Sequence, residues 1–181
     1  MNLQKTYQET IKFATLKFVE KNLNIPDSNL PYVVHLSNVA MEILIAAQHS
    51  NNFDVNYAIQ LALLHDNIED TDTTHQELEA VFGREVADGV LALTKNDALP
   101  KSEQLIDSLH RIQQQPKEVW AVKLADRITN LQQPPKSWSQ EKIQVYKDEA
   151  KLILEQLKGG NSYLENRLAE MIEVYSQYIT S

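Results

Sequence analysis

The sequence predicts an all-α protein with a single domain. Only four glycines and six prolines interrupt its 181 residues. Apolar residues recur mainly at spacings of three and four, which is the period of an amphipathic helix. A chain of this length can bury a continuous core without disulfides or a structural metal. We therefore expect one helical bundle over residues 1–181.

The first half of the chain predicts helices that end at turn-forming residues. Pro26 and Pro31 bracket a turn after the first helix. Apolar spacing then runs through PYVVHLSNVAMEI and LALLHDNIEDTD. Thr74 with Glu77 three residues later has the form of a capping box, so another helix should begin there. The predicted helices are 2–21, 31–49, 54–69 and 74–81.

The second half is divided by glycine and proline in the same way. Gly83 follows a short helix and Pro116 precedes another. The pair Pro134-Pro135 ends that helix, and Gly159-Gly160 separates the last two. The predicted helices are 84–95, 101–114, 117–132, 139–157 and 161–178.

Composition excludes several classes of protein. The absence of cysteine rules out disulfides and thiolate zinc sites, so a metal would need imidazole and carboxylate ligands. The net charge of -8, without a lysine-arginine block, argues against binding to DNA or RNA. No apolar stretch is long enough to span a bilayer, and the first residues do not resemble a signal peptide. We expect a cytoplasmic protein that does not bind membranes.

The stretch LALLHDNIEDTD places chemistry directly behind a run of core leucines. Leu61, Leu64 and Ile68 have core spacing, while His65 and Asp66 lie on the adjoining edge. Packed leucines fix the backbone, so the two polar side chains lose little freedom when they bind a ligand. Adjacent histidine and aspartate can both reach one metal ion.

Two other predicted helices each carry one polar residue in an apolar context, His35 and Asp126. A buried charge needs a partner or a metal. Taken alone, His35 would more often be a hydrogen-bonded core histidine, and Asp126 would more often pair with Lys123 or Arg127. The joint occurrence of these residues with His65 and Asp66 favours a metal site.

The pattern H...HD...D resembles the HD-domain metal-dependent phosphohydrolases. It is most similar to the hydrolase domain of RelA/SpoT proteins and to small alarmone hydrolases, which remove pyrophosphate from the 3′ position of guanosine (p)ppGpp. The stretches PYVVH, ALLHDNIEDTDTT with FGREV and LT, and VKLADRITNL carry the resemblance, over about residues 30–175. It implies an HD-domain helical bundle and a soluble enzyme with a nucleotide substrate.

The resemblance also implies roles for individual residues. One divalent metal, usually manganese in this family, would be held by His35, His65, Asp66 and Asp126. Glu69 and Asp70 match the family's ED pair, which activates or places the attacking water. An acid one turn from a metal ligand can accept a proton from water without being a ligand itself.

Substrate contacts are implied at fewer positions. Asn130 and Tyr146 match nucleotide-contacting residues of the family, and Ser28 stands at a matching position. Lys101 and Arg127 are further candidates because the phosphates of a polyanionic ligand need local positive charge.

The chain departs from the family at one place. Pro26 and Asp27 stand where the family has an arginine-lysine pair, whose arginine stacks on guanine. Proline cannot replace a stacked arginine. The identity of the base is therefore open, whereas metal-dependent phosphohydrolysis is unaffected.

Three functions follow as hypotheses. The first is an alarmone 3′-pyrophosphohydrolase. The second is a phosphatase acting on another nucleotide, such as ppApp, NADPH or a nucleotide monophosphate, and the third is a nucleotide sensor without catalysis.

The last predicted helix carries three tyrosines, Tyr163, Tyr175 and Tyr178. They should pack on the body of the protein or on a second copy, so a homo-oligomer is one possible assembly.

Overall fold

A computed structural model describes residues 2–26 and 28–179, and within these ranges the fold is all-α, as predicted. Two residues, Asn24 and Pro31, form an isolated bridge that closes the turn after the first helix. The helices are α1 (Leu3–Glu20), α2 (Val33–Gln48), α3 (Val55–Leu64), α4 (Asn67–Asp70), α5 (His75–Phe82), α6 (Arg84–Leu93), α7 (Lys101–Gln113), α8 (Lys117–Asn130), α9 (Gln140–Gln156), α10 (Ser162–Tyr175) and the 3₁₀ helix η1 (Ser176–Tyr178).

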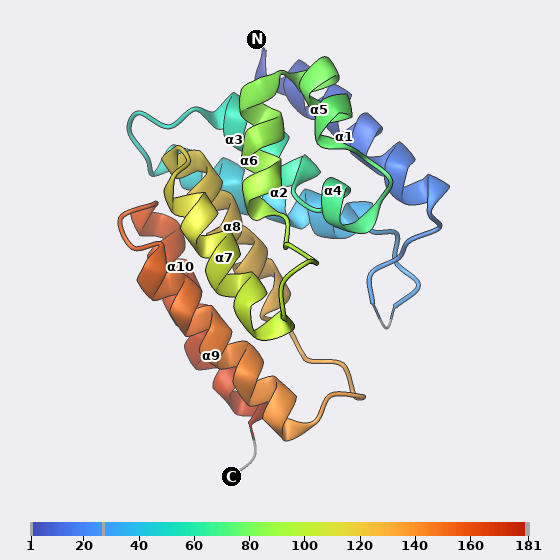
Figure 1. Cartoon of the computed structure of the whole chain (residues 1–181). Helices are drawn as coiled ribbons and strands as arrows, with labels where there is room; N and C mark the ends of the chain where they lie inside the picture. Colours follow the sequence, from blue (N-terminus) through green and yellow to red (C-terminus); the bar gives the residue numbers. More distant parts are fainter. Residues whose placement is uncertain (1, 27, 180–181) are drawn as a thin grey trace.

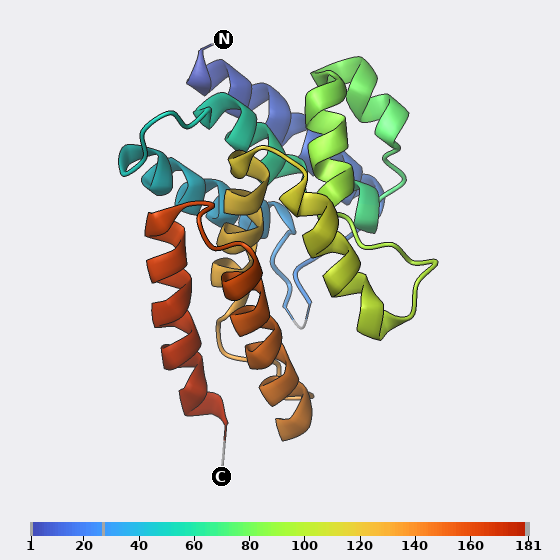
Figure 2. The ribbon, with the colours of Figure 1, turned by 60° about the vertical axis from the view of Figure 1, so that its left-hand side comes forward.

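Helix α3 lies at the centre of the bundle. It packs against α1, α2, α6 and α8, and the leucines of its last turn are inaccessible to solvent. Helices α9 and α10 lie side by side at the end of the molecule opposite α1 and α5 (Figures 1 and 2). The packing of α3 against four other helices fixes its C-terminal end, after which His65 and Asp66 follow.

Close packing of α6 on α3 depends on a glycine. A Cβ at Gly89 would lie 2.6 Å from Leu61 Cδ2 and 2.7 Å from Tyr57 Oη. Such distances are well inside van der Waals contact, so the Leu61 and Tyr57 side chains would have to move to admit a side chain here. Leu61 thus keeps its place in the core directly before the polar motif.

The predicted helix 54–69 is wrong as a single element. It is divided into α3 and α4, with His65 and Asp66 between them. The His65 ring bonds the Ala62 carbonyl at 2.8 Å, an acceptor that a continued helix would offer to the N–H of Asp66. Asp66 has φ -99° and ψ -1°, the bridge conformation typical of turns and active sites.

The N-cap predicted at Thr74 is confirmed, but its reciprocal half is not formed. Thr74 Oγ1 accepts from the N–H of Glu77 at 3.2 Å. The Glu77 carboxylate instead pairs with Lys17 of α1 at 2.7 Å. The start of α5 is therefore fixed against α1 by a side-chain ion pair, and α4 lies between them in the chain.

The tyrosines of the C-terminal helix pack on the body of the protein. Tyr175 is buried, Tyr178 lies edge-on against it at 5.5 Å, and Tyr163 stacks on His49 at 4.7 Å. None of the helices in the described ranges is apolar over a length that could cross a membrane.

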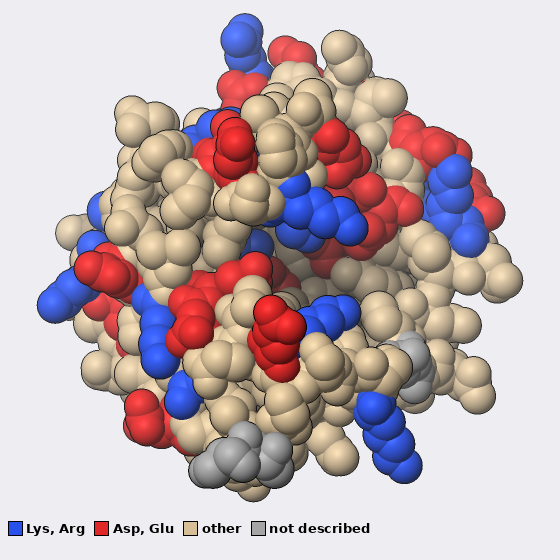
Figure 3. Space-filling model, turned by 60° about the horizontal axis from the view of Figure 1, so that its bottom comes forward, with Lys and Arg blue, Asp and Glu red and all other residues tan. Residues whose placement is uncertain are grey.

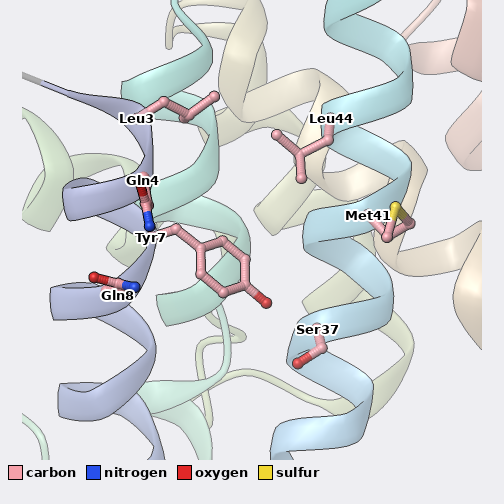
Figure 4. Close-up of a pocket in the computed structure, with 7 residues that line it drawn as sticks. All are labelled: Leu3, Gln4, Tyr7, Gln8, Ser37, Met41 and Leu44. Atoms are coloured by element: carbon pink, nitrogen blue, oxygen red, sulfur yellow. The ribbon is translucent and has the colours of Figure 1, made fainter.

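A groove of about 500 Å³ between α1 and α2 contains none of the predicted site residues (Figure 4). Its polar groups are mainly uncharged amides and hydroxyls. Tyr7 and Leu3 of α1 face Leu44, Met41 and Ser37 of α2 across it. This apolar groove thus lies apart from the titratable motif.

Candidate metal centre and active site

Four predicted ligands from three separate parts of the chain meet in one buried cluster. The Nε2 atoms of His35 and His65 are 3.2 Å apart, and Asp126 Oδ1 lies 3.5 Å from the first and 3.7 Å from the second. Asp66 Oδ2 lies 2.8 Å from His65 Nε2 and 3.5 Å from His35 Nε2. His35 comes from the first turn of α2, Asp126 from α8, and the HD pair from the break after α3.

The orientation of His65 is set by the backbone. Its Nδ1 bonds the Ala62 carbonyl and therefore carries the proton in the neutral ring, which leaves Nε2 as the atom with an available lone pair. A histidine that ligates a metal commonly donates its other ring nitrogen in this way. The same bond that ends α3 thus aims His65 at the cluster.

Electrostatics in the cluster show how strongly its groups interact. Burial acts to lower the pKa of His65, but the Asp66 and Asp126 carboxylates outweigh burial and raise it well above its usual value. His35 shows the same balance with a smaller rise in pKa. Burial acts to raise the pKa of Asp66, yet the His65 charge and both imidazole hydrogen bonds hold it far below its usual value.

The residues present fit a divalent cation. His35, His65 and Asp126 each offer an atom within 4.8 Å of the others, and all three are buried. Two imidazoles with carboxylates and no thiolate suit a borderline to hard divalent ion. Two carboxylates at a buried position also need compensating positive charge, which such an ion supplies.

Asp126 has the basic partner that the sequence offered as an alternative. Lys123 Nζ lies 3.2 Å from Asp126 Oδ2, and burial of the carboxyl, which would raise its pKa, is outweighed by Lys123 and the two imidazoles. Asn130 Nδ2 donates to Oδ1 at 2.6 Å. The ion pair and the cluster therefore coexist, because the two oxygens of Asp126 face different neighbours.

Tyr32 also contacts the cluster, through Asp66. Its hydroxyl donates to Asp66 Oδ2 at 2.6 Å, and its ring stacks on Phe18 with centroids 4.4 Å apart. Burial raises the pKa of Tyr32 well above its usual value, so the hydroxyl stays protonated and remains a donor. It therefore fixes the orientation of the Asp66 carboxylate.

Glu69 and Asp70 lie on the four-residue helix α4, next to the cluster. Lys95 contacts both Glu69 oxygens through its backbone and its side chain. Partial burial and the charges of Asp66 and Glu69 raise the pKa of Asp70 to about 6. Glu69 is thus paired with a cation, whereas Asp70 lies near two other carboxylates, Asp66 and Glu69.

Asn67, which begins α4, is fully buried, and neither polar atom of its amide has a hydrogen-bond partner. An unpaired buried amide costs about 1–3 kcal/mol. It lies directly after the HD pair, so the break between α3 and α4 carries a local energetic cost.

Arg127 and Tyr146 lie together on the α8–α9 side of the cluster. The Arg127 guanidinium is 4.1 Å from the centroid of the Tyr146 ring and 3.3 Å from Glu149. Burial raises the pKa of Tyr146 to about 12. These two predicted substrate contacts are engaged with each other.

Ser28 and Lys101 lie outside the buried cluster. Ser28 Oγ donates to the Ile25 carbonyl and accepts from the Leu30 N–H, both at 3.1 Å, which closes the turn before α2. Lys101 is exposed at the start of α7. Pro26 lies in that same turn, whereas Asp27 is outside the described residues.

Two residues that contact the site were not predicted, Tyr32 and Lys95. Tyr32 precedes His35 by three positions, so helical spacing could have placed both on one face. Lys95 is separated from Glu69 by 26 positions, and no local signal connects them.

The space-filling view shows a hollow with acidic side chains on its wall and basic side chains at its margin (Figure 3).

This chain belongs to the HD domain family, whose pattern it matches over residues 17–159. It is similar to the guanosine-3′,5′-bis(diphosphate) 3′-pyrophosphohydrolase MESH1 of Danio rerio, with 35% identity over 90% of both chains. The MESH1 protein of Xenopus tropicalis is 32% identical, again over 90% of both chains.

A solved structure gives the same relationship in three dimensions. It is described as a metazoan ortholog of SpoT that hydrolyzes ppGpp, and it superposes with a TM-score of 0.79. The match has 28% identity and covers 93% of this chain and 94% of the other. The HD-domain fold expected from the motifs is therefore confirmed.

Proposed function

We propose that this protein is a manganese-dependent hydrolase that removes the 3′-pyrophosphate of an alarmone nucleotide such as (p)ppGpp. The metal ligands in this proposal are His35, His65, Asp66 and Asp126. The observation that carries it is the convergence of these four side chains, in which the two histidine Nε2 atoms lie 3.2 Å apart and each lies 2.8 to 3.7 Å from both carboxylates.

The reaction needs one water and two proton movements. Water forms a bond to the phosphorus next to the ribose 3′-oxygen, and the bond from that phosphorus to the 3′-oxygen breaks. Pyrophosphate leaves with the oxygen of the water, and the nucleoside 5′-diphosphate keeps a 3′-hydroxyl. One proton must leave the water and one must reach the 3′-oxygen.

The chain supplies groups for these movements. A divalent ion bound here supplies Lewis-acid chemistry, offsetting charge on the phosphoryl oxygens and making water more acidic. Glu69 accepts the proton of the attacking water, and Asp70 is a second carboxyl that can return a proton to the 3′-oxygen. Tyr32 and Asn130 hold the carboxylates of Asp66 and Asp126 in place.

Substrate recognition in this proposal rests on charge more than on the base. Lys123, next to Asp126, brings positive charge to the site in a protein with a net charge of -8. Asn130, which bonds the Asp126 carboxylate, remains a candidate substrate contact, and Lys101 is a candidate only for phosphates that extend beyond the cluster. With Pro26 in place of the family's arginine, the base cannot be read by the usual stacked guanidinium.

Product analysis tests this function. The purified protein is incubated with manganese and ppGpp, and in parallel with ppApp and NADPH, with excess chelator as the blank and Glu69→Gln as a variant expected to be slow. Manganese-dependent release of pyrophosphate from ppGpp is the expected result. Pyrophosphate from ppApp alone would support the reaction but change the base.

Other products would overturn the proposal. Orthophosphate without pyrophosphate would indicate a phosphatase built on the same fold. If none of the three compounds is hydrolysed while manganese still binds, the sensor hypothesis becomes the better account. Equal turnover in the Glu69→Gln protein would refute the role of Glu69 without refuting the metal site.

A further inference from the structure

Lys95 contacts both oxygens of the Glu69 carboxylate. Its backbone N–H donates to Glu69 Oε2 at 3.0 Å, and its ammonium nitrogen lies 2.5 Å from Glu69 Oε1. Since one residue makes both contacts, the carboxylate cannot rotate without losing at least one of them. A glutamate has three side-chain torsions, so this double contact removes much of its freedom.

The backbone that carries Lys95 is itself fixed. Thr94 is the C-cap of α6, and its hydroxyl donates to the Val90 carbonyl at 2.9 Å. Arg111 of α7 donates to the Thr94 carbonyl at 2.7 Å and to the Ala92 carbonyl at 3.1 Å. Helices α6 and α7 together therefore hold the N–H group that meets Glu69.

The Lys95 ammonium also interacts electrostatically with the ligand cluster. Burial acts to lower the pKa of Lys95, but the Glu69 carboxylate outweighs burial and raises it, with smaller contributions from Asp66 and Asp126. The side chain is about half exposed. A partly exposed positive charge thus lies against the proposed proton acceptor and interacts with two carboxylates of the ligand cluster.

We propose that Lys95 is a positioning residue for Glu69, which holds the carboxylate in the orientation that meets the attacking water. This role rests on the proposed function, because it requires Glu69 to act in the reaction. Two simpler roles compete with it. Lys95 could contact the substrate phosphate directly, or the pair could be a surface salt bridge without functional effect.

Kinetics of matched variants distinguish these roles. Lys95→Met removes the ammonium but keeps the backbone contact, and Lys95→Arg retains the charge. Both are measured in the full-length protein with manganese and ppGpp, alone and combined with Glu69→Gln. Lys21→Met is the control, because Lys21 pairs with Asp72 on the loop after α4 at 2.6 Å and is similarly exposed.

A positioning role predicts a particular pattern. In Lys95→Met, kcat should fall about 10–100-fold, the usual effect of removing a group that orients a functional side chain. The KM for ppGpp should change less than about twofold, since the ground-state contacts remain. Lys95→Arg should recover most of kcat, and Lys21→Met should match the wild type.

The double variant gives the sharpest distinction. If Lys95 acts through Glu69, Lys95→Met should cause no further loss of kcat in the Glu69→Gln background. Manganese affinity, measured by calorimetry without substrate, should be unchanged in Lys95→Met. This second readout does not depend on turnover.

Several outcomes would overturn the proposal. An unchanged kcat in Lys95→Met would leave only a surface ion pair. A raised KM, or a further loss in the Glu69→Gln background, would assign Lys95 to direct contact with the substrate. An equal loss in Lys21→Met would indicate a general charge effect. If the wild type itself shows no manganese-dependent turnover, the proposed function fails first, and the role of Lys95 fails with it.

Discussion

Replacing Tyr32 by phenylalanine should weaken manganese binding without disturbing the fold. The change removes only the hydroxyl, which donates to Asp66 Oδ2 at 2.6 Å. The ring should stay in place because it stacks on Phe18 with an interplanar angle of 6°. The Asp66 carboxylate would then lose the donor that sets its orientation.

Two considerations give the size of the effect. A hydrogen bond to a charged group contributes about 1.5–3 kcal/mol. Removal of a group that orients a metal ligand typically costs 10–100-fold in affinity, which corresponds to about 1.4–2.7 kcal/mol. The two ranges agree, so the manganese Kd should rise about 10–100-fold.

Calorimetric titration with manganese measures this directly. Tyr57→Phe is the matched control, because the Tyr57 hydroxyl donates to the Glu85 carbonyl at 3.2 Å, on α6 and apart from the predicted ligands. A manganese Kd within twofold of the wild type in the Tyr32 variant would refute the reasoning. Equal weakening in both variants would show that the effect is not specific to Asp66.

Three further predictions concern the ligands, the core and the acidic pair. Manganese at 100 times its Kd should stabilise the wild type by about 2.7 kcal/mol and Asp126→Ala not at all, as melting with and without metal would show. Gly89→Ala should lower the free energy of unfolding in urea by about 1–3 kcal/mol, because the added Cβ would lie 2.6 Å from a Leu61 methyl. With chelator present, Asp70→Asn should gain stability over the wild type as pH rises from 3.8 to about 6.

The sign of the last effect follows from the raised pKa of Asp70. Protonation of Asp70 contributes to the stability of the folded state. This contribution is fully present below the pKa of Asp70 in the unfolded chain and is lost as pH rises through the folded pKa of about 6. The amide introduced by Asp70→Asn does not titrate, so the difference should level off above that pH at about 1 kcal/mol after allowance for solvent screening. A difference that is independent of pH would contradict the prediction.

Controls for the other two changes use exposed positions away from the ligand cluster. Asp148→Ala, on the exposed surface of α9, should leave the manganese-induced shift in Tm intact. A full shift in the Asp126→Ala protein would remove that residue from the ligand set. Leu91→Ala, at an exposed position of α6, should cost less stability than Gly89→Ala, and the reverse order would contradict the packing argument.

Most helix ends could be predicted because local residues determine them. Proline and glycine stop or start helices through backbone conformation alone. The ends at Pro116 and Gly159 therefore needed no tertiary information. The ligand residue types were equally visible, because histidine and aspartate in apolar helices conflict with their surroundings.

The break at His65 could not be predicted in the same way. Apolar spacing continues from Leu64 to Ile68, and the segment contains neither glycine nor proline. The helix ends because a side chain competes for a backbone carbonyl, a contact that depends on the rotamer of His65. Contacts such as Lys95 with Glu69 depend on how α6 packs, which no local pattern encodes.

The division between α3 and α4 places the proposed metal ligands and Glu69 on different structural elements. The proposed metal ligands are held by α2, by α8 and by the residues that follow α3, and His35, His65 and Asp126 are buried. Glu69 is carried by a helix of four residues that depends on its neighbours for its orientation. Under the proposed function, changes on α4 or around Lys95 would therefore alter the rate or the choice of phosphate group without changing the proposed metal ligands. In evolution, substrate preference would then change through residues on and around α4, while the residues proposed to bind the metal stayed the same.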